Sequence, residues 1–356
     1  MKKSLVILAA LSSIFFVNCS NNTEDPAPDN DAVLRKEVLT DVSSSVITET
    51  YKKLYDNAVL LKVAADAFSI GDETKLTNLK NAWIATRTPW ECSEGFLYGP
   101  VDTKGIDPAI DSWPVDVTAI NNIIASPAPI TSNVLESNNE ARGFHALEYF
   151  IWGLNNNKTA SQFTPREVEF IVAASQNLKE KTLELYNGWL GSQGNFVNNF
   201  INAGTPGTVY VSQKDALKEI AEGLVIIADE VANGKIEEPL NGNAGAAKQE
   251  AEESRFSNNS KLDFANNIRS IQNIYLGDYN GFERKGLSDI VSKTNSALDN
   301  NIKFKITAAI LAIEAIPGTF TNAIVNNRPA VQNAQVKVSE LKVLLDTQLI
   351  PFISNL

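Results

Sequence analysis

The sequence predicts an all-α protein made of two packed helical bundles. Apolar residues recur at spacings of three and four along most of the chain, and strand-like alternation is nearly absent. Glycine, asparagine and proline interrupt this pattern between the periodic stretches. Long helices are therefore predicted over 33–68, 76–96, 139–154, 165–190, 213–233, 261–276, 296–316 and 331–353.

The N-terminus has the plan of a lipoprotein signal peptide. Lys2 and Lys3 precede an apolar run over 5–17 that is too short to span a bilayer as a permanent helix. Cys19 follows this run, where a cysteine can accept a diacylglycerol anchor that holds a protein on a membrane. We therefore predict a signal peptide over 1–18, lipidation at Cys19, and a location on the outer membrane or cell surface rather than the inner membrane. Residues 16–18 depart from the usual pattern, so plain secretion is the alternative.

A polar segment separates this anchor from the helices. Residues 19–32 are rich in Asn, Asp, Pro and Thr and bury too little apolar surface to fold, which predicts a flexible tether. The rest of the chain is long enough for two domains, and a break at 202–207 provides the boundary. We expect an N-terminal helical bundle over 33–205 and a C-terminal bundle over 206–356, with about four long helices in each.

Charge and cysteine content narrow the function. The formal net charge is −11, which argues against nucleic acid as a partner and is compatible with cationic ligands. With Cys19 acylated, Cys92 is the only thiol left, so no intramolecular disulfide can form. Stability must then come from packing.

Several residues indicate where helices begin, bend and end. Pro165 occupies a first-turn position behind Thr164, an expected N-cap. Pro89 should bend its helix and free a backbone carbonyl about four residues earlier. Three glycines lie close to expected helix ends: Gly153, Gly191 and Gly277.

The most informative pair is His145, the only histidine, and Glu148. On a helix they lie one turn apart, so both side chains can reach a single ion. The core face of this helix is expected to be Phe144, Leu147, Phe150 and Ile151, which leaves His145 on the stripe of Arg142, Tyr149 and Trp152. The competing interpretation is a structural histidine whose hydrogen bonds are satisfied.

A second group of candidate residues lies on one face of the helix predicted over 76–96. Trp83, Arg87, Trp90 and Glu94 fall on one side of the predicted helix. The structural alternative is an Arg87–Glu91 ion pair with the tryptophans in the core. The loop that follows is dense in carboxylates without the spacing of an EF-hand: Asp102, Asp107, Asp111 and Asp116.

The ligand inventory limits the chemistry. One histidine excludes a two-histidine zinc site within one chain, and the mature part has neither a cysteine cluster nor a methionine for soft ligation. One imidazole with carboxylates suits iron, manganese or weakly held zinc. A serine hydrolase could use His145 as its base, but no nucleophile elbow is present.

The segment 143–148, Gly-Phe-His-Ala-Leu-Glu, resembles the GxHxxE signature of imelysin-like proteins. Further stretches agree with conserved blocks of that family in the same order: 82–91, 93–96, 99–102, 253–259, 270–277 and 286–289. The resemblance covers nearly all of the mature chain. It implies two helical bundles in one compact body, with the signature helix in the first bundle and a cleft between the bundles.

The resemblance also implies a function. Family members are exported, often as lipoproteins, and several serve iron uptake. The leading hypothesis is a lipoprotein that binds a metal for iron acquisition, with iron favoured and zinc as the alternative, and with an iron-uptake transporter or another envelope protein as its partner. The expected metal ligands are His145, Glu148, Glu94 and Asp116. The expected ligand cleft comprises Arg87, Trp90, Ser93 and Arg142, whose arginines could hold an anionic chelator.

Two other hypotheses remain at this stage. The first is a metallopeptidase, an activity also assigned to the family, with Glu94 as general base. The single histidine weighs against it, so we do not expect an enzyme. The second is a scaffold that binds a ligand or partner protein without metal, using Trp83, Trp90 and Trp152 as aromatic anchors.

Overall fold

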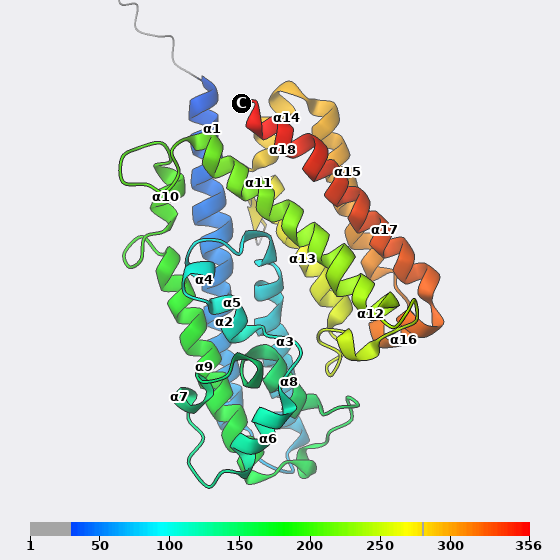
Figure 1. Cartoon of the computed structure of the whole chain (residues 1–356). Helices are drawn as coiled ribbons and strands as arrows, with labels where there is room; N and C mark the ends of the chain where they lie inside the picture. The colour runs from blue at the N-terminus through cyan, green and yellow to red at the C-terminus, as the bar shows by residue number, and fades with distance from the viewer. Residues whose placement is uncertain (1–29, 280) are drawn as a thin grey trace, which may run out of the picture.

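The computed structural model describes residues 30–279 and 281–356. Helices dominate this part of the chain (Figure 1). Its strands are two short ones, Asp278–Tyr279 (β1) and Phe282–Glu283 (β2), which pair antiparallel. The predicted all-α fold is confirmed. The predicted signal peptide, Cys19 and most of the predicted tether lie outside the described residues.

The first half of the chain packs around one long rod. This rod runs through α1 (Asn30–Asp41), the π-helical η1 (Val42–Ile47) and α2 (Thr48–Ala67). Three further long helices are α3 (Glu73–Glu91), α8 (Gly143–Trp152) and α9 (Pro165–Trp189). Helix α2 packs against α3 and α9, and α8 packs against the same two helices. These helices match the predicted ranges closely.

Short helices fill the connections of this half, and only two of them, at 94–96 and 139–141, fall inside the predicted ranges 76–96 and 139–154. The short helices are η2 (Glu94–Phe96), α4 (Pro100–Thr103), α5 (Ile106–Ile110), α6 (Val117–Ala125), α7 (Ser132–Leu135), η3 (Asn139–Ala141), η4 (Ala160–Gln162) and α10 (Val197–Ile201). Most of them have only one or two turns, which is too little sequence for a period of 3.6 residues to show.

The second half forms a second group of packed helices (Figure 1). In chain order they are α11 (Gln213–Glu230), η5 (Val231–Ile236), α12 (Glu237–Asn241), η6 (Gln249–Ala251), α13 (Ser260–Leu276), α14 (Leu287–Thr294), α15 (Ser296–Glu314), α16 (Phe320–Asn326), α17 (Arg328–Leu344), η7 (Leu345–Leu349) and α18 (Ile350–Ser354). Helix α15 packs against α13 and α17, and α17 also packs against α11.

The two halves meet along α3 and α13. Helix α13 packs against α3, and α11 packs against η2. Polar residues of both halves meet there, since Arg87 of α3 lies 3.5 Å from Asp263 of α13. Helix α1 packs against α11 and α14 of the second half. The apolar core runs through both halves. The division at residue 205 stays a prediction. Within the described part of the chain, no helix is both long and apolar enough to cross a membrane.

The predicted helix ends follow local chemistry. Thr164 caps α9 through a reciprocal capping box with Glu167, and Pro165 stands in its first turn. Gly153 and Gly277, at the C-caps of α8 and α13, both have φ of +71°. These three predictions are confirmed, and α9 ends two residues before Gly191.

Pro89 affects α3 as expected. Proline lacks the N–H that would bond to the carbonyl of residue 85. The carbonyl of Ala85 instead accepts a hydrogen bond from Asn57 Nδ2 of α2 at 2.5 Å. The side chain of the neighbouring helix thus satisfies the carbonyl that proline leaves free.

Candidate metal centre

The signature helix α8 begins in close contact with the C-terminal end of α5. Gly143 has φ of +76°, and a Cβ atom there would lie 2.3 Å from the carbonyl oxygen of Ile110. Glycine is therefore required for this approach. The contact places His145, two residues into the helix, beside Asp111, which directly follows α5.

Glu148 holds the imidazole of His145 in place. Its Oε2 lies 2.9 Å from His145 Nδ1, and its Oε1 accepts hydrogen bonds of 2.7 Å from the backbone N–H and the hydroxyl of Ser257. Both side chains of the pair are fully buried. Because both oxygens of Glu148 are engaged, this residue orients His145 instead of sharing an ion with it as the sequence predicted.

The other imidazole nitrogen faces two carboxylates. His145 Nε2 lies 3.1 Å from Asp111 Oδ1 and 3.4 Å from Glu253 Oε1. It is buried and makes no hydrogen bond to any described residue. Ligand atoms of Asp111, His145 and Glu253 all lie within 4.8 Å of one another, which is a geometry that can hold a metal ion.

Protonation of His145 reflects the same environment. Burial and the charge of Arg87 lower the pKa of the imidazole. The adjacent carboxylates of Glu148 and Glu253 outweigh both effects and raise the pKa above its usual value. The position therefore attracts positive charge, and a metal would take the place of the Nε2 proton.

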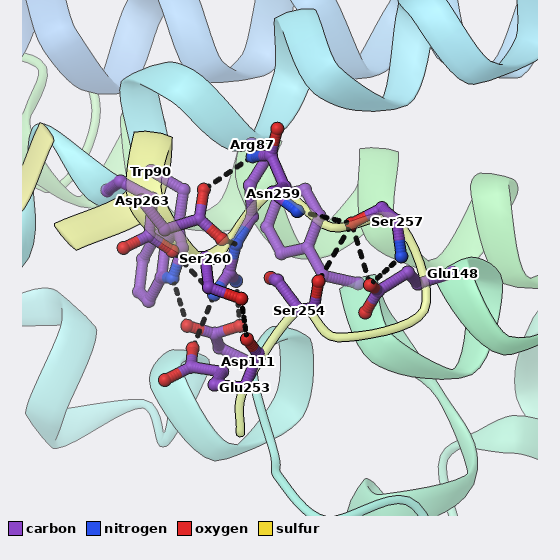
Figure 2. Close-up of polar contacts among 12 residues, drawn as sticks. Arg87, Trp90, Asp111, Glu148, Glu253, Ser254, Ser257, Asn259, Ser260 and Asp263 are labelled. Carbon is purple, nitrogen blue, oxygen red and sulfur yellow. Dashed lines mark hydrogen bonds and ion pairs between the residues drawn. The ribbon is translucent and has the colours of Figure 1, made fainter. Parts of the chain in front are cut away.

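Arg87 of α3 lies at the centre of the carboxylates (Figure 2). Its Nη1 contacts Asp111 Oδ1, its Nη2 contacts Glu253 and Glu91, and its Nε lies 3.5 Å from Asp263 Oδ2. Burial lowers the pKa of Arg87, but Glu91 and Asp263 outweigh it, so the pKa is raised and the guanidinium stays charged. With every nitrogen on a carboxylate, Arg87 has no face for an anionic chelator, which corrects that prediction.

The Arg87–Glu91 ion pair of the structural alternative is thus present. Trp83 and Trp90 are fully buried, as that alternative required. Trp90 nevertheless contributes to the site, because its Nε1 donates a 2.5 Å hydrogen bond to Asp111 Oδ2. Trp113 packs edge-on against His145, with ring centroids 5.0 Å apart.

A second acidic group adjoins the first. Ligand atoms of Glu91, Glu94 and Asp111 also lie within 4.8 Å of one another. Buried Lys235 lies 2.9 Å from Glu253 Oε2 and 3.8 Å from Glu94 Oε2. Burial would raise the pKa of Glu253, but Lys235 and the neighbouring imidazole of His145 hold it well below its usual value. Burial raises the pKa of Glu94 despite Lys235.

The loop that supplies Glu253 has unusual backbone geometry. Ser254 and Asn258 have φ of +54° and +59°, which is uncommon for residues other than glycine. Asn259 Nδ2 donates a 2.6 Å hydrogen bond to Asp263 Oδ1, which ties the loop to α13 (Figure 2). Strained loops of this kind concentrate at functional sites.

Three predicted residues lie in other networks. Asp116 caps α6 by accepting a 2.9 Å hydrogen bond from the N–H of Ala119. Arg142 bonds Asn139 and lies 3.0 Å from Glu136. The hydroxyl of Ser93 donates to the carbonyl of Trp90 in a buried turn. The structure therefore does not bring Asp116, Arg142 or Ser93 to His145.

Sequence reasoning missed Asp111 and Glu253 as candidate ligands. Asp111 belonged to the acidic loop that we noted, and Glu253 opens one of the blocks that resemble the imelysin-like family. No spacing signals their meeting, because one comes from each half of the chain.

Comparisons with known proteins agree with this architecture. The family model described as imelysin, peptidase M75, matches residues 47–348. Iron-regulated protein A of Synechococcus elongatus is 24% identical over 328 residues, which cover 90% of this chain and 88% of the relative. The crystal structure described as an iron-regulated protein A precursor from Parabacteroides distasonis is 28% identical, with a TM-score of 0.78, over 88% of this chain and 94% of that chain.

A more distant structure shares the fold. An imelysin-like protein from Psychrobacter arcticum is 16% identical, with a TM-score of 0.73, over 91% of this chain and 96% of that chain.

Proposed function

The chain belongs to the imelysin family, and we propose that it binds a metal ion, iron in the first place, through Asp111, His145 and Glu253. The observation that carries this proposal is the buried Nε2 of the single histidine, which faces two carboxylates but makes no hydrogen bond to a described residue. Buried polar atoms are almost always satisfied, and a metal ion would satisfy this one.

The surrounding residues fit this role. Glu148 Oε2 can accept a hydrogen bond from Nδ1–H of His145, and Nε2 would then be the nitrogen that binds an ion beside the carboxylates. Trp90 holds the second oxygen of Asp111. Carboxyl groups also outnumber basic groups in the cluster, since Glu91, Glu94, Asp111, Glu148, Glu253 and Asp263 surround Arg87, His145 and Lys235.

The donor set selects the class of ion. One imidazole nitrogen with carboxylate oxygens suits iron or manganese and accepts zinc, whereas copper(I) prefers sulfur ligands. The Synechococcus and Parabacteroides proteins are both named for regulation by iron. These names support iron as the ion bound here.

We place this binding in iron acquisition at the cell envelope. The support is the sequence before residue 30, where the predicted signal peptide and Cys19 would anchor the protein on a membrane. The partner in this proposal is an iron-uptake transporter or another envelope protein that receives the ion.

Burial favours binding over peptide hydrolysis. A metallopeptidase must bring a peptide carbonyl to its metal. The side chains of Asp111, His145 and Glu253 are 4%, 0% and 12% exposed, respectively. A polypeptide cannot reach these atoms without movement of the two halves.

The test is titration of the full mature chain, purified without chelator, with iron(II), manganese and zinc in a calorimeter. We expect stoichiometric binding by the wild type. His145→Ala and Glu253→Gln should weaken it by more than the roughly 100-fold that loss of an outer partner can cause.

The matched control is Asp116→Asn, which removes a carboxylate that caps a helix away from the site. It should leave affinity unchanged. Equal affinity of His145→Ala and wild type would rule out the proposed site.

A further inference from the structure

We propose that Arg87 competes with the metal ion for the same carboxylate oxygens and thereby sets a reversible affinity. This inference rests on the proposed metal site and names the residue that regulates it. Arg87 is then an internal counter-cation that must give up part of its contacts when the ion binds.

The competition is visible at single atoms. Arg87 Nη1 contacts Asp111 Oδ1, the oxygen that lies 3.1 Å from His145 Nε2. Arg87 Nη2 contacts Glu253 Oε1, the oxygen that lies 3.4 Å from the same nitrogen. The two oxygens nearest the imidazole are therefore the two that the guanidinium binds. An ion on Nε2 needs the lone pairs of both.

Burial keeps the charge of Arg87 effective against a metal ion in this site. Its side chain is 0% exposed, so water and salt screen its charge poorly. A guanidinium does not lose its proton in proteins. The metal and Arg87 would thus be two unscreened positive charges sharing one pair of oxygens.

Arg87 has a second pair of partners that the ion does not use. Glu91 Oε1 lies 2.5 Å from Nη2, and Asp263 Oδ2 lies 3.5 Å from Nε. These carboxylates have partners of their own, since Asn267 of α13 donates to Glu91 and Asn259 of the preceding loop donates to Asp263, both at 2.6 Å. The guanidinium can release Asp111 and Glu253 while it stays paired, so the site has two satisfied arrangements.

This arrangement suits a protein that passes its ion on. Without a counter-cation, so many buried carboxylates would either bind the ion nearly irreversibly or destabilise the fold. Arg87 neutralises them and lowers affinity at the same time. Removal of its charge should therefore tighten metal binding, whereas removal of an organising residue should weaken it.

The experiment compares Arg87→Met and Arg87→Lys in the full mature chain, with zinc as a redox-inert probe in competition with a chelator. Arg87→Met should bind zinc about 10- to 100-fold more tightly, within the range of coupling between interacting ligands. Arg87→Lys keeps the charge and should stay close to the wild type. The control is Arg142→Met, a buried arginine on another network, which should not change zinc affinity.

Thermal unfolding provides a second readout. Arg87→Met should have a lower Tm than the wild type without metal and a larger rise in Tm with zinc. Equal or weaker zinc binding by folded Arg87→Met, next to a wild type that binds, overturns the competition and leaves the metal site standing. Absence of binding by the wild type and by every variant overturns the proposed function and the competition together.

If Arg87→Met does not fold, the wild type still answers the question. In a crystal structure with zinc on His145, the Arg87 guanidinium should have left Asp111 Oδ1 while remaining on Glu91 or Asp263. An unchanged Arg87–Asp111 contact beside the bound zinc would contradict the proposal.

Discussion

Two buried regions of this molecule contrast in how they are built. Around Trp189, at the end of α9, rings pack on rings: Tyr51, Tyr98, Phe196 and Phe200 lie with centroids 5.1–6.2 Å from the indole. Around Arg87, at the junction of α3 and α13, charges face charges. Both regions exclude water, but only the first gains from doing so.

The difference separates stability from function. Burial of aromatic surface stabilises the fold directly, whereas burial of ions costs desolvation that pairing only partly recovers. A cluster with more carboxylates than cations is therefore a poor device for stability. Its presence between the halves is consistent with the proposed metal site.

The largest expected effect is the loss of stability on substitution of Trp189 in the aromatic cluster. Trp189→Ala should lower the free energy of unfolding by about 3–5 kcal/mol, because it removes a fully buried indole and leaves a cavity. Metal affinity of the folded variant should not change, since the ring cluster shares no residue with the site. Urea unfolding and zinc titration of the same sample measure both quantities. Loss of affinity without unfolding would show that the two regions are coupled.

An intermediate effect, on zinc affinity, is expected from Glu148→Gln in the candidate metal site. The amide oxygen can still accept a hydrogen bond from Nδ1–H of His145. It lacks the negative charge of Glu148, which makes the imidazole a stronger ligand. Zinc affinity should fall by about 10- to 100-fold, with a smaller loss of stability than for Trp189→Ala.

Ser257→Ala is the control for Glu148, because it removes only the hydroxyl bond to Oε1 and keeps the backbone N–H. It should weaken binding less than Glu148→Gln. Complete loss of binding in Glu148→Gln would mean that Glu148 touches the ion, as the sequence first suggested.

The sequence was sufficient for the parts of the fold that local chemistry controls. Apolar periodicity predicted every long helix, and Thr164 and Pro165 marked the start of α9. The i,i+4 spacing raised the Arg87–Glu91 pair as the structural alternative, and that pair is present. His145 and Glu148 were paired correctly for the same reason, because one turn of helix separates them. Each of these relations spans only a few residues.

The site itself required long-range information. Asp111 and Asp116 stand five residues apart in one acidic loop, yet the first faces His145 and the second caps α6. Periodicity cannot distinguish them, although an aspartate directly before an apolar helix is a recognisable N-cap. Glu253 meets Asp111 only because α13 packs on α3, and nothing in the local pattern encodes that contact.

The smallest effect is expected from an exposed ion pair that resembles the Arg87 network in composition. Glu136 lies 3.0 Å from Arg142 and 3.1 Å from Lys181, but its side chain is 40% exposed. Burial raises its pKa, but the hydrogen bonds from Lys181 and Asn177 together outweigh this effect and lower the pKa below its usual 4.5. Because the folded state then binds the proton more weakly than the unfolded state, this stabilisation is present above pH 4.5 and is lost as the pH falls through the lowered pKa.

Glu136→Gln should therefore cost less than about 1 kcal/mol at neutral pH, and the difference from the wild type should vanish in acid, as urea unfolding can measure. A cost that persists in acid would assign the effect to packing rather than charge. A cost as large as that of Trp189→Ala would break the contrast drawn above, because an exposed ion pair would then stabilise the fold as much as a buried ring. The expected small value instead means that burial distinguishes the Arg87 network, where we propose a cation site, from the ion pair at Glu136.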